Sequence, residues 1–123
     1  MTISRTQGQT PLLPGSTSIA GLVFTSGLVA PSALTDHPGD SVAQIADALA
    51  ELRRVLAEAD SDTGNVLRLE CFLADAADFA EWNRQYLQVW PDPGPARTTL
   101  VSKFANSSIL VEIQVIAARR TSS

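Results

Sequence analysis

The chain has 123 residues, of which 45% are hydrophobic and 18% are charged. This length corresponds to one domain, and the composition is too apolar for an intrinsically disordered chain. Nine basic residues against thirteen acidic ones give a net charge of −4, which argues against a nucleic-acid-binding surface because such surfaces are normally basic. We therefore expect one globular domain over residues 1–123 and no nucleic-acid partner.

Cysteine and histidine are too scarce for a disulfide framework or a metal centre. Cys71 and His37 are the single residues of their kinds, so neither an internal disulfide nor a Cys/His metal cluster can form. The first ten residues lack the basic-then-apolar layout of a signal peptide. The uncharged stretch 6–35 contains prolines, glycines and many hydroxyl residues, unlike a transmembrane helix. We expect a cytoplasmic protein without cofactor, metal or membrane contact.

The first half of the chain predicts two strands and a helix. Residues 22–26 (LVFTS) form an apolar run that ends at Gly27, which is typical of a strand followed by a turn. We expect residues 2–5 to pair with this strand. Residues 41–59 carry apolar side chains at the spacing of one helix face. Ser41 followed by Gln44 predicts a capping box at the start of this helix.

A further strand and a second helix follow. Residues 66–73 (VLRLECFL) alternate in polarity, which predicts a strand with one buried face. That face would consist of Leu67, Leu69, Cys71 and Leu73. The second helix is predicted from about residue 76 to residue 90, with Asp75 as its cap and Pro91 as its end.

The last third predicts two strands, residues 97–104 and residues 109–118, joined by a turn at 105–108. In the final strand the odd-numbered residues form a continuous apolar face. The even-numbered face holds Leu110, Glu112, Gln114 and Ile116. This order of elements predicts an α+β fold, with two helices on one face of a mixed sheet. Because the other sheet face is partly apolar, we expect it to meet another subunit.

Two charged residues could carry chemistry. Arg97 opens a predicted strand, where a guanidinium can hold a planar carboxylate through two parallel hydrogen bonds. The alternative is an ordinary solvated arginine. Glu112 interrupts the most apolar strand and points away from Val111 and Ile113. It could deprotonate a water in a cleft, and the alternative is a solvent-facing position on a half-buried strand.

Four short stretches, in this order along the chain, resemble the RidA (YjgF) family of imine and enamine deaminases. They are residues 25–27 (TSG), residues 78–80 (DFA) with Asn83 and Tyr86, residues 95–99 (PARTT) and residues 111–117 (VEIQVIA). The resemblance implies a chorismate-mutase-like fold, a homotrimer with a central barrel, and active sites in clefts between subunits. It also implies water attack on a small 2-imino acid derived from 2-aminoacrylate, which gives a 2-keto acid and ammonia without a cofactor.

The same resemblance assigns roles to individual residues. It implies that Arg97 binds the substrate carboxylate, that Glu112 handles the water, and that Ser26 and Gly27 line the pocket. Since a short turn joins the predicted strands of Arg97 and Glu112, we expect both to approach one site. Asn83 lies on the apolar side of the second helix, and we interpret it as a structural amide.

Three positions depart from the family pattern. Leu13 stands where many members have a tyrosine, Leu28 where a glutamine is frequent, and Thr99 where a cysteine is frequent. We expect all three to line the pocket, and the two leucines predict a preference for imines with apolar side chains. The predicted activity is that of a 2-iminobutanoate/2-iminopropanoate deaminase. Two alternatives stay open: a non-catalytic module that binds a carboxylate metabolite, and a specialised-pathway relative that acts on a larger imine.

Overall fold

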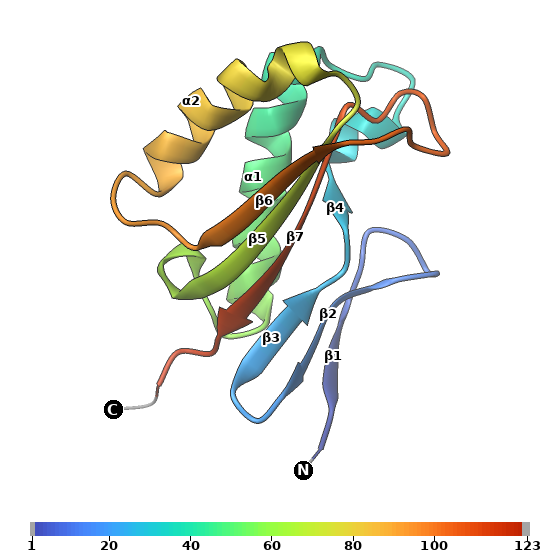
Figure 1. Cartoon of the computed structure of the whole chain (residues 1–123). Coiled ribbons are helices and arrows are strands. Elements are labelled where there is room, and N and C mark those ends of the chain that lie inside the picture. Colours follow the sequence, from blue (N-terminus) through green and yellow to red (C-terminus); the bar gives the residue numbers. More distant parts are fainter. Residues whose placement is uncertain (1, 122–123) are drawn as a thin grey trace.

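Seven strands form one mixed sheet in the computed structural model, which describes residues 2–121 (Figure 1). The strands are β1 (Ser4–Gln7), β2 (Pro14–Ile19), β3 (Leu22–Thr25), β4 (Leu28–Val29), β5 (Val66–Leu73), β6 (Ala96–Val101) and β7 (Val111–Ala118). Their order across the sheet is β1-β2-β3-β7-β5-β6, and β4 pairs with β7. Of these pairings β5 with β6 is parallel, and the others are antiparallel.

Two α-helices, α1 (Ser41–Glu58) and α2 (Phe79–Val89), cover one face of this sheet (Figure 1). A 3-10 turn, η3 (Ala76–Asp78), leads into α2, and the Asp75 carboxylate accepts a hydrogen bond from the Ala77 N–H at 2.9 Å, as a capping residue does. The predicted α+β fold, with both helices on one face of a mixed sheet, is therefore confirmed. The opposite face is left uncovered by the helices.

The predicted capping box at the start of α1 was wrong. The cap is Asp40, whose Oδ1 accepts from the Ala43 N–H at 2.9 Å. The Gln44 side chain is fully buried and does not form the predicted cap. Its side-chain amide forms hydrogen bonds with three backbone groups outside the helix, those of Gly39, Ser108 and Leu110. A buried amide thus ties the start of α1 to the connection between β6 and β7.

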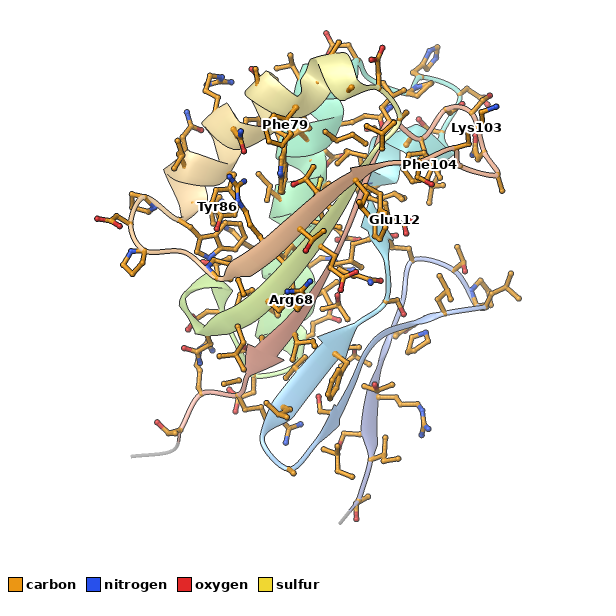
Figure 2. All side chains as sticks on the ribbon, in the orientation of Figure 1. Arg68, Phe79, Tyr86, Lys103, Phe104 and Glu112 are labelled. Carbon is orange, nitrogen blue, oxygen red and sulfur yellow. The ribbon has the colours of Figure 1, made fainter. Side chains whose placement is uncertain are left out.

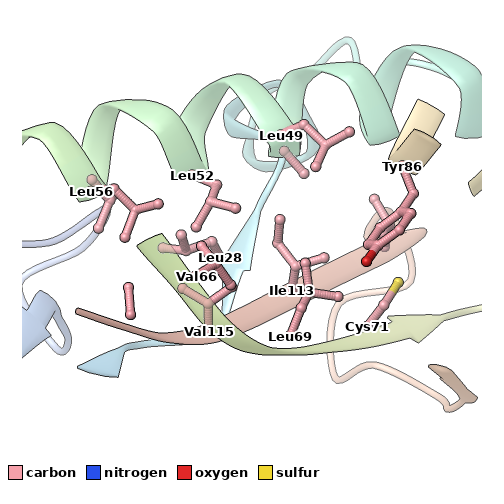
Figure 3. Packing of buried hydrophobic residues seen from close by; sticks show 14 of the residues in the cluster. Leu28, Leu49, Leu52, Leu56, Val66, Leu69, Cys71, Tyr86, Ile113 and Val115 are labelled. Atoms are coloured by element: carbon pink, nitrogen blue, oxygen red, sulfur yellow. The ribbon is translucent and has the colours of Figure 1, made fainter. Parts of the chain in front are cut away.

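The hydrophobic core lies between α1, α2 and the sheet (Figure 3). Leu52 and Leu56 of α1 face Leu69 of β5 and Ile113 of β7, and all four side chains are fully buried. Burial alternates strictly along β7, as the apolar pattern predicts. Since burying one such side chain stabilises the fold by about 1.5–3 kcal/mol, this layer fixes which face each strand residue occupies.

The buried face of β5 was predicted correctly except at Leu67. Its pairing with β7 shifts register between Val66 and Arg68, and this bulge adds one residue to the strand. Leu67 is consequently 52% exposed, whereas Val66 joins the core.

The N-terminal region has one more long strand than the sequence predicts. β1 pairs with β2 rather than with β3, so the expected pairing of residues 2–5 with residues 22–26 was wrong. The sequence of β2, PGSTSI, shows no alternation of apolar and polar side chains. Its buried positions are instead taken by Gly15 and by two small hydroxyl residues, Ser16 and Ser18.

Candidate active site

Arg97 lies on the helix side of the sheet, at the start of the edge strand β6. Its register partner is Leu69, whose side chain is buried beneath the helices. The Arg97 Nη1 donates to the Asn83 Oδ1 at 2.7 Å, and the guanidinium carbon lies 4.3 Å from the centre of the Tyr86 ring. Both partners belong to α2, which Figure 2 shows alongside β6. A hydrogen bond and a cation–π contact therefore hold Arg97 against α2.

These contacts orient Arg97 without covering it, because the residue stays exposed. A guanidinium has five N–H donors, so a bond to Asn83 leaves enough of them for bidentate binding of a carboxylate. Asn83 therefore contacts the predicted substrate-binding residue, so the amide that we interpret as structural bonds to the Arg97 side chain. The signal available in the sequence was spacing, since Asn83 and Tyr86 lie three residues apart on the predicted helix.

Glu112 lies on the opposite face of the sheet. Its neighbours in β7, Val111 and Ile113, are buried beneath the helices, so the Glu112 side chain points away from them. Burial raises the pKa of this half-buried carboxyl above its usual value. A carboxylate with a pKa closer to neutrality is a better general base, which agrees with the role predicted for Glu112.

The segment from Ser26 to Val29 passes directly beside Glu112. A Cβ atom at Gly27 would lie only 2.5 Å from the Glu112 Oε2, so a larger residue at this position would displace the Glu112 carboxylate. The Ser26 hydroxyl donates to the Pro14 carbonyl at 2.7 Å, which ties the loop that carries the half-exposed Leu13 to the same segment. The structure thus brings Ser26 and Gly27 to Glu112, with Leu13 on the adjacent loop.

Within one chain, Arg97 and Glu112 do not share a cleft. β5 lies between β6 and β7 in the sheet, and the two side chains are on opposite faces. The prediction that a short turn brings them to one site was therefore wrong for a single chain. The connection over residues 102–110 carries the chain past β5 instead of forming a hairpin. Figure 2 shows Tyr86 beneath α2, whereas Glu112 lies near β4 and β7.

Leu28 and Thr99, two of the residues that depart from the family pattern, lie in different parts of the structure. Leu28 is only 2% exposed and pairs with Ile113 inside the core, so the expectation that it lines the pocket was wrong (Figure 3). Thr99 pairs with Cys71, which places it on the same face of β6 as Arg97. Burial raises the pKa of the Cys71 thiol to about 12, so this cysteine is not a nucleophile at neutral pH.

The uncovered face of the sheet carries a polar cluster among apolar side chains. Arg68 donates to Thr98 at 2.9 Å, and Gln114 donates to Glu70 at 3.1 Å. Arg68, Glu70 and Gln114 border a cavity of about 200 Å³ that also contacts Phe24 and Ile116. Among residues 2–121, no group of three or more metal-ligating side chains gathers around one point. Over the same range, no helix is long and apolar enough to cross a membrane.

Comparisons with known proteins agree with this fold. Residues 5–119 match the protein family described as Endoribonuclease L-PSP. The mitochondrial protein mmf1 of Schizosaccharomyces pombe is 33% identical over 100 residues, which cover 79% of this chain but only 62% of mmf1. The 3-aminoacrylate deaminase RutC of Acinetobacter baylyi is 28% identical over 109 residues, 87% of this chain and 86% of RutC. The crystal structure of a YjgF-family protein from Neisseria meningitidis matches with a TM-score of 0.82 and 31% identity, over 99% of this chain and 98% of that one.

Proposed function

Because this chain belongs to the endoribonuclease L-PSP family, also named the YjgF or RidA family, we propose that it is a cofactor-free hydrolytic deaminase. Its substrates are small 2-imino or enamine acids, and its products are a 2-keto acid and ammonia. The proposal is supported by an oriented arginine and a half-buried carboxylate with a raised pKa at the two motif positions. The name of the relative RutC, a 3-aminoacrylate deaminase, supports the same class of reaction.

The proposed reaction depends on two residues of the protein. Arg97 holds the substrate carboxylate and so fixes the imine carbon in place. Glu112 accepts a proton from a water as the water oxygen bonds to that carbon, while the imine nitrogen takes up a proton. The protonated Glu112 then gives its proton to the amino group of the tetrahedral intermediate, which leaves as ammonia when the C–N bond breaks. As the keto C=O bond forms, the hydroxyl proton passes to solvent and replaces the proton that solvent gave to the imine nitrogen. One water is consumed, and no change in oxidation state occurs.

A complete site requires two chains, because Arg97 and Glu112 lie on opposite faces of one sheet. We place the site where Arg97 of one subunit faces Glu112 of the next, in the homotrimer that the resemblance to the family implies. The sheet face without helices supports such contacts, since Phe24 and Leu100 expose apolar surface there. Sedimentation at micromolar concentration tests this part, and a monomer near 13.1 kDa would contradict it.

The activity itself is tested by release of ammonia and keto acid from freshly generated 2-aminoacrylate. We expect turnover by the wild-type protein, unaffected by chelators. Binding of a keto acid without any turnover would favour the alternative of a non-catalytic carboxylate-binding module. Activity on a bulkier imine alone would favour the specialised-pathway alternative. Ribonuclease activity, which the family description names, has less support because the net charge is −4 and His37 is the single histidine.

The cytoplasmic location stays a prediction. The relative mmf1 is named as mitochondrial, which makes a mitochondrial or other compartment the alternative. Fractionation of cells that express the full chain distinguishes the two.

A further inference from the structure

Three side chains, Gln9, Glu51 and Arg54, form a hydrogen-bonded clamp. The clamp joins separate parts of the chain close to Val29, the register partner of Glu112. Gln9 lies in the loop between β1 and β2, and the other two residues lie on α1. The Gln9 Nε2 donates to the Glu51 Oε2 at 3.0 Å and to the Val29 carbonyl at 2.8 Å. This clamp therefore connects the N-terminal loop, α1 and β4.

Glu51 is an unusual carboxylate because only 7% of its side chain is exposed. Arg54 donates to both of its oxygens, at 2.5 Å and 3.1 Å. The bonds from Arg54, together with the one from Gln9, hold the pKa of Glu51 below its usual value. A buried charge without such partners destabilises a fold, so this carboxylate is kept in place by the whole clamp.

The Gln9 amide also occupies the free edge of β4. On its other side β4 pairs with β7. The Val29 carbonyl accepts from Gln9 at 2.8 Å, and the Val29 N–H points to the Gln9 Oε1 at a longer 3.5 Å. One side-chain amide thus faces both backbone groups of Val29, as a residue of a neighbouring strand would.

Val29 is the register partner of Glu112. Two residues earlier, Gly27 approaches the Glu112 carboxylate, and Ser26 bonds to Pro14 at the end of the same loop that carries Gln9. The clamp is therefore attached to both segments that adjoin Glu112. A shift of Val29 would change how closely Gly27 covers the carboxylate.

We propose that Gln9 and Glu51 are positioning residues for Glu112, which hold the segment from Ser26 to Val29 against its carboxylate. The catalytic role of Glu112 rests on the proposed function. The effect of the clamp on Glu112 can be measured without any substrate, so the two proposals can fail separately.

The test compares Gln9→Ala and Gln9→Glu with the control Glu58→Gln in the full chain. Gln9→Glu removes the donor to Val29 and places a second carboxylate beside Glu51. Glu58 is a matched control because it also accepts from Arg54, at 2.8 Å, yet it is exposed and does not contact Gln9. The first readout is the pKa of Glu112, measured by NMR of the labelled carboxyl carbon. The second is hydrogen exchange of the peptide that spans residues 26–29.

We expect both Gln9 variants to lower the pKa of Glu112 towards the usual glutamate value and to speed exchange of residues 26–29. The control should change neither. Adding Glu51→Gln to Gln9→Glu restores a donor–acceptor pair and should recover part of both signals. With an imine substrate, Gln9→Ala should lower kcat about tenfold with little change in KM, because the displacement affects Glu112 and leaves Arg97 in place.

An unchanged pKa of Glu112 and unchanged exchange in folded Gln9→Ala and Gln9→Glu would overturn the proposal. So would a lowered Tm with no change at Glu112, because the clamp would then only stabilise the fold. A wild-type protein without deaminase activity would overturn the proposed function, and the NMR comparison would still decide the role of the clamp.

Discussion

Arg97 and Glu112 differ in how exposed they are and in which residues contact them. The contacts of Arg97 control its orientation, whereas the surroundings of Glu112 control its pKa. Arg97 is exposed, and Asn83 and Tyr86 fix its direction. Glu112 is half-buried against Gly27, and burial raises its pKa. A residue that holds a carboxylate needs orientation and full charge, whereas a general base needs a pKa near neutrality. One chain therefore holds both groups in the state that their proposed roles require, but on opposite faces of its sheet, so neither reaches the other.

The largest loss of activity is expected when the proton acceptor alone is removed. Glu112→Gln keeps the size of the side chain but cannot accept a proton from water. We expect kcat to fall by roughly 10²–10⁴-fold, with substrate binding largely retained. Steady-state kinetics on imines generated in situ measures both, and wild-type turnover in this variant would disprove the role of Glu112.

The stability of the same variant gives an independent check. Burial raises the folded-state pKa of Glu112, so the folded chain holds this proton more tightly than the unfolded chain does. The associated stability is present below the usual glutamate pKa and is lost as pH rises through the folded pKa. At pH 7, Glu112→Gln should therefore have a Tm equal to or above that of the wild type. At pH 4 the advantage should shrink.

Leu28 tests where the boundary between core and site lies. Because Leu28 is buried in the core, Leu28→Gln places an amide among apolar side chains and should destabilise the fold by about 3 kcal/mol. Leu12→Gln is the matched control, since Leu12 is 90% exposed and the same change there should alter stability by less than about 0.5 kcal/mol. Urea unfolding measures both variants, and equal stabilities would mean that Leu28 lies at the surface of the pocket and not in the core.

Substitutions of Arg97 test its proposed role in substrate binding. Arg97→Ala should lower kcat/KM about 100-fold, mainly through KM, because the substrate carboxylate loses its charged partner. Arg97→Lys should recover little, since an ammonium cannot form two parallel hydrogen bonds to a carboxylate. Titration with a keto acid product measures the same loss without turnover. Equal affinities for wild type and Arg97→Ala would contradict the assignment.

Tyr86 should show the smallest effect, because it acts on Arg97 and not on the substrate. Tyr86→Phe keeps the ring beneath the guanidinium, whereas Tyr86→Leu removes it. The cation–π contact of the buried Tyr86 ring with the exposed Arg97 is worth about 0.5–1 kcal/mol, so Tyr86→Leu should weaken binding by about two- to fivefold and Tyr86→Phe much less. Identical KM values for the two variants would mean that the ring does not orient Arg97.

Local patterns in the sequence were sufficient for the elements with strong periodicity. The helix at 41–58 and the alternation along 111–118 follow directly from apolar spacing, and motifs identified Arg97 and Glu112. Their relative placement could not be predicted locally, because it depends on the insertion of β5 between two strands that follow each other in sequence. Leu28 was misplaced for a similar reason, since only its pairing with Ile113 turns it inward. The expected preference for apolar imines now depends on Leu13 alone.

The most direct test of a site shared between two chains is complementation between inactive variants. At substrate concentrations far below KM, Arg97→Ala and Glu112→Gln each have low activity alone, and their subunits are mixed under conditions that allow exchange. If each site takes Arg97 from one subunit and Glu112 from the next, random mixed trimers contain intact sites, and about a quarter of wild-type activity should return. No recovery, despite subunit exchange demonstrated by mass spectrometry, would contradict the shared site.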